Sequence, residues 1–276
     1  MDKIMSLTEA VTLVKDGDTV AFGGNVLHRT PMSFVREIAR KKIKNLNLVK
    51  TAGAHEVDLL CAMGLVQSVA AGFISYETKF GLATHYRKAV ESGIVKTNEH
   101  ACYTVICALR GAMMNVPFMP VKGLVAGDLL EENDYFVVVE DPFGGDPVTL
   151  VKSIIPDVAI IHVQECDKYG NARIYGPKFE DVLISRAAKK VILTTEQIVS
   201  ESRMKLNNEY IDIPGFLVEG VVLALNGASP TSCYKKYDID EKMLKSFISM
   251  KSKEEIEGYL KKYEIKDHIG DRMVKR

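Results

Sequence analysis

Short apolar runs alternate with segments of helical periodicity along most of this chain of 276 residues. The apolar and β-branched runs predict strands at residues 19–22, 47–51, 68–74, 135–140, 148–154, 158–163, 191–195 and 216–225. Apolar positions three and four apart predict helices that begin near residues 6 and 31 and that span residues 57–63, 84–92, 102–115 and 179–189. Because the two patterns alternate, we expect an α/β fold with an open, mainly parallel sheet flanked by helices.

The ends of the chain differ in pattern from its middle. Ser6 followed by Glu9 has the spacing of a capping box, and we expect the first helix to end near Gly17. Residues 241–276 are rich in Lys and Glu and have a helical pattern. We therefore predict one α/β domain over residues 1–240 and a C-terminal helical arm packed on it over residues 241–276. Residues 121–133 fit no element well.

The run at residues 158–163 is almost continuously apolar, as expected of a strand that is covered on both faces. His162, Gln164, Glu165 and Asp167 gather at its carboxyl end, which is where open α/β sheets bind ligands. The spacing alone favours a simpler reading, in which Asp167 accepts hydrogen bonds from nearby backbone N–H groups. In that turn Gly170 and Asn171 would accept left-handed dihedral angles.

Charge and cysteine content exclude several classes of protein. The 36 basic and 36 acidic side chains cancel, and the one short basic run, at residues 40–44, is not the footprint of a nucleic-acid-binding protein. Five cysteines without a Cys-x-x-Cys pair argue against a disulfide framework or a zinc site, and the histidines lack the spacing of metal ligands. No apolar run approaches a membrane span and no signal peptide is recognisable, so we expect a cytoplasmic protein without metal.

Two loops are candidates for ligand binding. Gly23, Gly24 and Asn25 follow a predicted strand and precede a helix, so their backbone N–H groups could approach a ligand oxygen. The alternative to ligand binding is that the two glycines only form a tight turn. The pattern does not match the Gly-x-Gly-x-x-Gly fingerprint of dinucleotide-binding proteins. The loop of Ser75, Tyr76 and Glu77 follows another strand; helix capping and a substrate role are both compatible with it.

Arg29 lies just before the helix that begins near Pro31. Its guanidinium could hold a carboxylate through two hydrogen bonds, which would suit a dicarboxylic acyl group. It could equally be an ordinary surface arginine.

Three segments together resemble one known family: residues 157–174, residues 16–24, and residues 213–230 with their Ile-Pro-Gly-Phe and Gly-Ala-Ser-Pro motifs. They resemble the A subunit of family I coenzyme A transferases, and within that family the glutaconate CoA-transferases most. The similarity runs from about Leu7 to about Asp240. Asn25 departs from the aromatic residue that the family usually has after the two glycines.

The resemblance implies a transfer of CoA between an acyl-CoA and a free carboxylic acid, with CoA as a substrate and no other cofactor. It places Gly23, Gly24, Asn25, Ser75, Tyr76 and Glu77 by the substrate, whereas Arg29 is a candidate for substrate binding from its side-chain chemistry alone. Family I enzymes form a glutamyl-CoA thioester on a Ser-Glu-Asn-Gly-like motif of the B subunit, and this chain has no such motif. The resemblance thus implies a hetero-oligomer in which a homologous B subunit supplies the catalytic residue.

Two alternatives remain open. Some relatives hydrolyse a C–C bond of cyclic acyl-CoA substrates with an acid from the A subunit, and Glu99 lies near the region where that acid would fall. The chain could also be a ligand-sensing domain without catalysis, because a fold does not determine a function.

Overall fold

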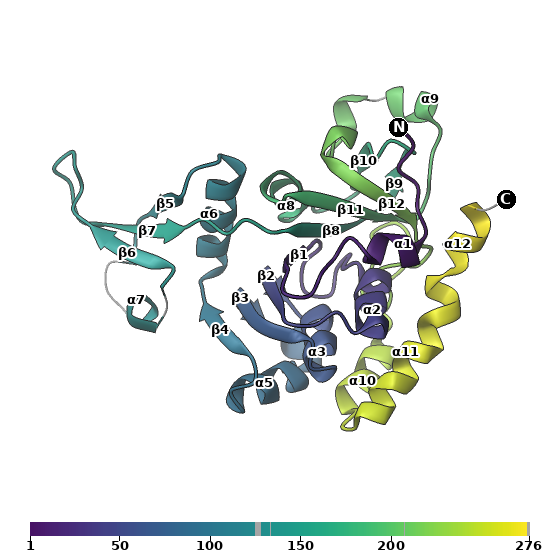
Figure 1. Ribbon diagram of the computed structural model, residues 1–276, viewed down its shortest axis with the longest axis horizontal. Coiled ribbons are helices and arrows are strands. Elements are labelled where there is room, and N and C mark those ends of the chain that lie inside the picture. The colour runs from purple at the N-terminus through teal and green to yellow at the C-terminus, as the bar shows by residue number, and fades with distance from the viewer. Residues whose placement is uncertain (125–127, 133, 207, 275–276) are drawn as a thin grey trace.

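The computed structural model describes residues 1–124, 128–132, 134–206 and 208–274, and its centre is a seven-stranded sheet (Figure 1). All the strand pairs of this sheet are parallel. In spatial order the strands are β12 (Val218–Leu223), β11 (Lys190–Thr195), β8 (Val158–Val163), β1 (Thr19–Phe22), β2 (Leu46–Gly53), β3 (Val66–Ile74) and β4 (Lys96–Glu99). The predicted open α/β fold is confirmed.

The sheet is buried on both faces because its strands carry apolar side chains at consecutive positions. In β8, Ile160 contributes to one hydrophobic core and the neighbouring Ile161 to the other. The first core is covered by α1 (Leu7–Val11), α2 (Met32–Lys41), α3 (His55–Ala62), α5 (Thr84–Glu91), α10 (Glu241–Ser249) and α11 (Lys253–Asp267). The second lies beneath α6 (Cys102–Met113) and α8 (Asp181–Ala187).

The strand order creates a switch point between β1 and β8. From β1 the chain builds the sheet outward through β2, β3 and β4, and it then returns to place β8 on the other side of β1. Loops that leave β1 and β8 at their carboxyl ends therefore diverge in opposite directions. Open α/β sheets bind ligands in the crevice formed this way.

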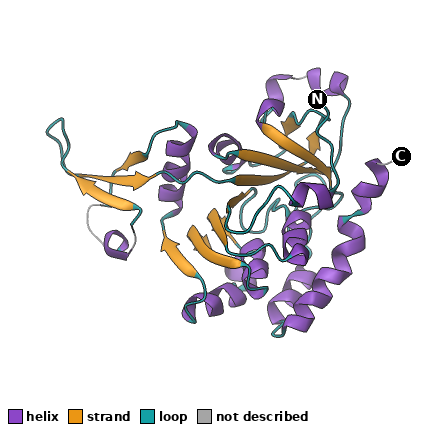
Figure 2. Cartoon of the chain, in the orientation of Figure 1, coloured by secondary structure: helices purple, strands orange, loops and turns teal. Residues whose placement is uncertain are grey.

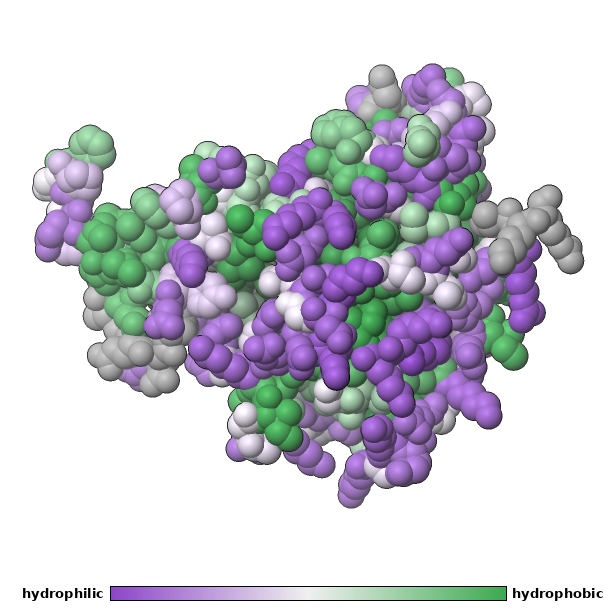
Figure 3. Space-filling model, viewed as in Figure 1, coloured by the Kyte–Doolittle hydropathy of each residue, from purple (hydrophilic) through white to green (hydrophobic). Residues whose placement is uncertain are grey.

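A second, smaller sheet projects from the main body (Figures 1 and 2). It is antiparallel, with β7 (Val148–Lys152) between β5 (Phe118–Val121) and β6 (Phe136–Val139). Two of the predicted strands therefore exist but belong outside the parallel sheet. Figure 3 shows apolar residues gathered over this projection, which include the exposed Val137 and Phe118.

The remaining elements are short. They are α4 (Glu77–Phe80), α7 (Leu129–Glu132), α9 (Glu201–Lys205), α12 (Ile269–Val274), the 3₁₀ helices η1 (Asn208–Tyr210) and η2 (Gly215–Leu217), and the pair β9 (Glu165–Cys166) and β10 (Ala172–Arg173). Helix α7 falls in the stretch that fitted no pattern, part of which lies outside the described residues. The capping box of Ser6 and Glu9 is present, but α1 ends at Val11 rather than near Gly17.

The C-terminal helices pack on α2 and α3 through charged as well as apolar side chains. Arg36 of α2 is fully buried and donates from Nε and Nη2 to the two carboxylate oxygens of Asp267, at 2.8 and 2.5 Å. Arg40 donates to the same carboxylate at 2.5 Å. Leu244 and Phe247 of α10 are fully buried in the core shared with the sheet. Residues 241–274 thus cover part of the core, and their status as a separate unit stays a prediction.

Candidate functional site

The loop after β1 is held by a buried lysine of the neighbouring strand. Lys50 of β2 donates from Nζ to the carbonyl oxygens of Phe22, Gly23 and Gly24, at 3.0, 2.9 and 2.6 Å. Its side chain is 3% exposed, and Glu56 lies 3.8 Å away. Burial is the main cause that lowers the pKa of Lys50. The three carbonyl groups replace the water that this ammonium would otherwise keep.

The backbone N–H groups of this loop are all used within the chain. Gly23 donates to the carbonyl oxygen of Ile160 at 2.8 Å, Gly24 to Asp181 Oδ1 at 2.9 Å, and Asn25 to the carbonyl oxygen of His28 at 2.9 Å. The expectation that these groups face a ligand oxygen is therefore wrong for this chain. The half-buried side chain of Asn25 is the polar group that the loop can offer instead.

Close packing explains the two glycines. A Cβ on Gly23 would lie 2.3 Å from Asp181 Oδ1, and one on Gly24 would lie 2.3 Å from the carbonyl oxygen of His28. Gly24 also has a φ of +72°, which side chains rarely permit. Glycine is required at both positions because other parts of the chain pack directly against this loop, as expected of a tight turn.

Arg29 is neither a surface arginine nor free to bind a carboxylate. Its side chain is 3% exposed, and Nη2 forms an ion pair with Asp181 Oδ2 at 2.7 Å. Nη1 donates to the carbonyl oxygen of His162 and Nη2 also donates to that of Pro177, at 2.9 and 3.0 Å. Arg29 therefore joins the chain segments after β1 and β8 across the switch point.

Tyr76, one of the candidate substrate-binding residues, is fully buried. Its hydroxyl group donates to Asp58 Oδ2 at 3.1 Å and lies 2.9 Å from Nδ1 of His55. Burial, together with the charge of Arg36, lowers the pKa of His55 to about 3, so this imidazole is neutral. Tyr76 belongs to a buried polar network beneath the edge of the sheet.

The other two residues of that loop do reach a cavity. Glu77 is exposed with a φ of +62°, and Ser75 donates its hydroxyl to the carbonyl oxygen of Gly81 at 2.9 Å. They line an open cavity of about 500 Å³ at the carboxyl end of β3, together with Phe73, Thr78, Gly81 and Leu82. Backbone strain in a non-glycine residue persists where the surrounding structure fixes it, and often marks a functional loop.

A larger cavity of about 720 Å³ lies above the switch point. Its walls are aromatic and basic: Tyr175, Phe179 and Tyr234 line it beside Lys235 and Lys236. Lys235 Nζ stands 5.6 and 5.7 Å from the ring centroids of Tyr175 and Tyr234. The strand end of β3 and its smaller cavity are separated from this region by β2.

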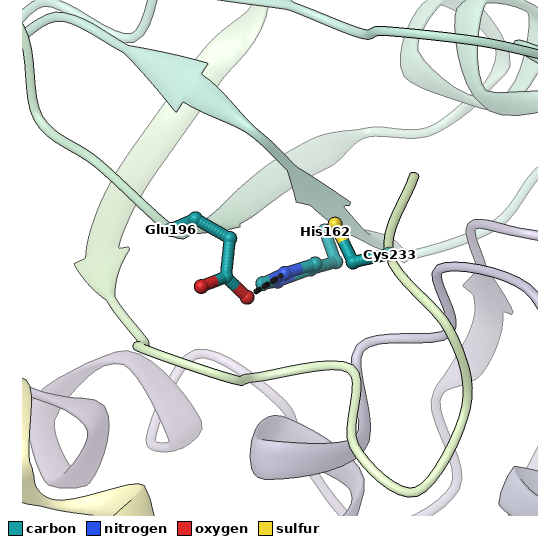
Figure 4. Close-up of side chains that lie close together, drawn as sticks. All are labelled: His162, Glu196 and Cys233. Carbon is teal, nitrogen blue, oxygen red and sulfur yellow. Dashed lines mark hydrogen bonds and ion pairs between the residues drawn. The ribbon is translucent and has the colours of Figure 1, made fainter. Parts of the chain in front are cut away.

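Among the described residues, His162, Glu196 and Cys233 form a buried cluster of metal-ligand types (Figure 4). His162 Nε2 is 2.9 Å from Glu196 Oε1 and Nδ1 is 2.9 Å from the hydroxyl oxygen of Thr194. Burial lowers the pKa of His162, but hydrogen bonds with Cys233 and Glu196 outweigh it and raise the pKa to about 9. His162 and Glu196 therefore form a buried, hydrogen-bonded ion pair.

The segment after β8 forms a turn capped by Asp167, which is the simpler of the two interpretations of its sequence. Asp167 Oδ1 accepts from the backbone N–H groups of Tyr169 and Asn171, at 2.9 and 3.0 Å. Gly170 has a φ of +87°, whereas Asn171 has no positive φ. Glu99 ends β4 at the same edge of the sheet and is exposed.

The polar loops and the switch point define an open α/β domain with candidate ligand cavities at the carboxyl edge of its sheet. Comparison with known proteins gives the family. The family model "Coenzyme A transferase" matches residues 4–224. The chain belongs to the coenzyme A transferase family.

The relatives include components of two-subunit enzymes. The A subunit of glutaconate CoA-transferase from Acidaminococcus fermentans is 32% identical over 97% of this chain and 90% of its own length. The crystal structure of glutaconate CoA-transferase from that organism superposes with a TM-score of 0.91 at 31% identity, covering 96% of this chain and 90% of the other. A variant of the decarboxylase AibA/AibB has a TM-score of 0.85 at 30% identity, with 95% and 98% covered.

An uncharacterized protein of Archaeoglobus fulgidus is 36% identical over 95% of this chain. The chain spans 59% of the length of that relative. Among the described residues, no helix is both long and apolar enough to cross a membrane.

Proposed function

We propose that this chain is the A subunit of a heteromeric CoA-transferase that moves CoA between an acyl-CoA and a free carboxylic acid. The observation that carries the proposal is the similarity to the A subunit of a glutaconate CoA-transferase along almost the entire chain. The polar loops at the carboxyl edge of the sheet agree with it. Because the sequence lacks a Ser-Glu-Asn-Gly-like motif, the nucleophilic glutamate is assigned to a homologous B subunit.

In the proposed reaction, the partner's carboxylate attacks the thioester carbonyl of the donor, and the CoA thiolate leaves to give a mixed anhydride. The thiolate then attacks the glutamyl carbonyl, which releases the donor's acid and leaves a glutamyl-CoA thioester. The acceptor's carboxylate repeats these steps in reverse. Covalent catalysis divides one difficult exchange into easier steps. Coenzyme A is a substrate in this scheme, and the proposal includes no prosthetic group.

This chain contributes the walls of the acyl site. Of the predicted set, Glu77 is exposed and Asn25 half-buried, and Ser75 lines the cavity at the end of β3, whereas Arg29 and Tyr76 are occupied by internal contacts. We assign the cavity at the end of β3 to the acyl group. A cytoplasmic location is part of the proposal and rests on the unpaired cysteines.

The test is dependence on the partner. The purified chain, the co-expressed complex and the homologous B subunit by itself are assayed for CoA exchange between a labelled acyl-CoA and a carboxylic acid. We expect exchange in the complex and in neither subunit by itself. When the complex is incubated with acyl-CoA and then treated with borohydride, we expect the B subunit to be modified and the mass of this chain to stay unchanged. Full activity of the single chain, or an adduct on its Glu77 or Glu99, would refute the proposal and favour a hydrolase.

A further inference from the structure

The lining of the cavity at the end of β3 restricts the acyl groups that it can accept. Phe73 and Leu82 are 43% and 52% exposed and provide apolar surface. Thr78 and Ser75 bring hydroxyl groups, and Glu77 brings a carboxylate. Among the described residues that line this cavity, none carries a positive charge. Glu77 is therefore the charged residue among those that line the cavity.

Arg29 and Lys50, buried cations near this edge, already have partners within the chain. Arg29 is paired with Asp181 and bound to two carbonyl oxygens. Lys50 is surrounded by three carbonyl oxygens and faces Glu56. Releasing either group to a substrate would leave buried partners unsatisfied, which costs more free energy than a new surface contact returns.

The exposed cations of the larger cavity lie elsewhere. Lys235 and Lys236 line the cavity above the switch point, whereas the acyl cavity is at β3, with β2 between β1 and β3. Adjacent strands are about 5 Å apart, so about 10 Å separates the ends of β1 and β3. A short acyl chain bound at β3 does not bring a terminal carboxylate to these lysines.

We propose that the acyl site of this chain selects uncharged acyl groups, branched or unbranched, and disfavours acyl groups with a second carboxylate. Phe73 and Leu82 would contact the acyl carbons, and Glu77 would repel a terminal carboxylate at short range. This preference is opposite to that expected from a dicarboxylic acyl group held by Arg29. The inference rests on the proposed function, since it takes this cavity as the acyl site.

The experiment compares kcat/KM of the assembled two-subunit complex for acyl-CoA donors matched in chain length. Pentanoyl-CoA and 3-methylbutanoyl-CoA represent uncharged acyl groups, and glutaryl-CoA represents dicarboxylic ones. We expect kcat/KM for the uncharged donors to be at least about tenfold higher than for glutaryl-CoA. A tenfold ratio corresponds roughly to the repulsion between one pair of like charges near a protein surface. A complex that exchanges CoA but prefers glutaryl-CoA would overturn the inference and leave the proposed function intact. No exchange with any donor would overturn both.

Two variants locate the selectivity in this cavity. Glu77→Gln should reduce the discrimination against glutaryl-CoA, and Leu82→Arg should shift the preference toward it by about tenfold or more. Ile265→Arg is the matched control, because it adds the same charge at another exposed apolar position, on α11. If neither cavity variant changes the ratio of the two kcat/KM values, while both complexes assemble, the acyl group does not bind at β3 and the inference is wrong.

Discussion

Replacing Lys50 by methionine tests how the loop after β1 is held. Methionine keeps most of the apolar volume of the side chain but has no donor. The change leaves the carbonyl oxygens of Phe22, Gly23 and Gly24 without the ammonium that now lies 2.6–3.0 Å away. Each buried acceptor left without a partner costs about 1–3 kcal/mol, and the loss of a buried charged partner about 3–5 kcal/mol in total.

We expect the free energy of unfolding to fall by about 3–5 kcal/mol, as measured by urea denaturation at pH 7. Glu56 limits the loss, because burial raises the pKa of its carboxyl group and it can take up a proton once Lys50 is absent. Exposed Lys44 provides the matched control, since Lys44→Met removes the same charge from a surface position. The control should change stability by less than about 0.5 kcal/mol.

The loop geometry provides a second readout. In the assembled complex, kcat/KM of Lys50→Met should fall by about tenfold or more beyond the loss of folded protein, because small displacements of a site reduce catalysis strongly. A loss of stability below about 1 kcal/mol would show that the three carbonyl groups find other partners. The view of Lys50 as the residue that fixes this loop would then be refuted.

Two further predictions concern buried groups. Gly24→Ala should destabilise the chain by about 2 kcal/mol or more, because its Cβ would lie 2.3 Å from a carbonyl oxygen at a φ of +72°; a stable variant with wild-type unfolding in urea would contradict the packing argument. Glu196→Gln should reduce stability most below pH 6.5. The pKa of His162 is raised to about 9, so its ion pair contributes fully below 6.5 and is lost as the pH rises through 9. The difference in stability from wild type should shrink between pH 6 and 9.5, whereas exposed Glu219→Gln should show no such trend.

The sequence alone determined the class of fold. Strand β1 matches its predicted range, because an apolar strand between two glycine-containing turns has few other options. The edge strand β4, with the polar sequence Lys-Thr-Asn-Glu, was missed because an edge strand needs no continuous apolar run. Strands β6 and β7 were predicted, but their antiparallel pairing in a separate sheet depends on contacts distant in sequence.

The roles of the candidate residues depended on tertiary contacts. Arg29 and Tyr76 have the side chains of substrate-binding residues, and a sequence pattern cannot show that Asp181 and Asp58 already occupy them. Lys50 gave one usable signal, a single charge within a buried strand, but its partners lie in the turn after β1. Periodicity records which residues are buried. Which polar groups satisfy one another is decided by the three-dimensional packing, because each buried donor or acceptor takes its partner from wherever the fold brings one within about 3 Å.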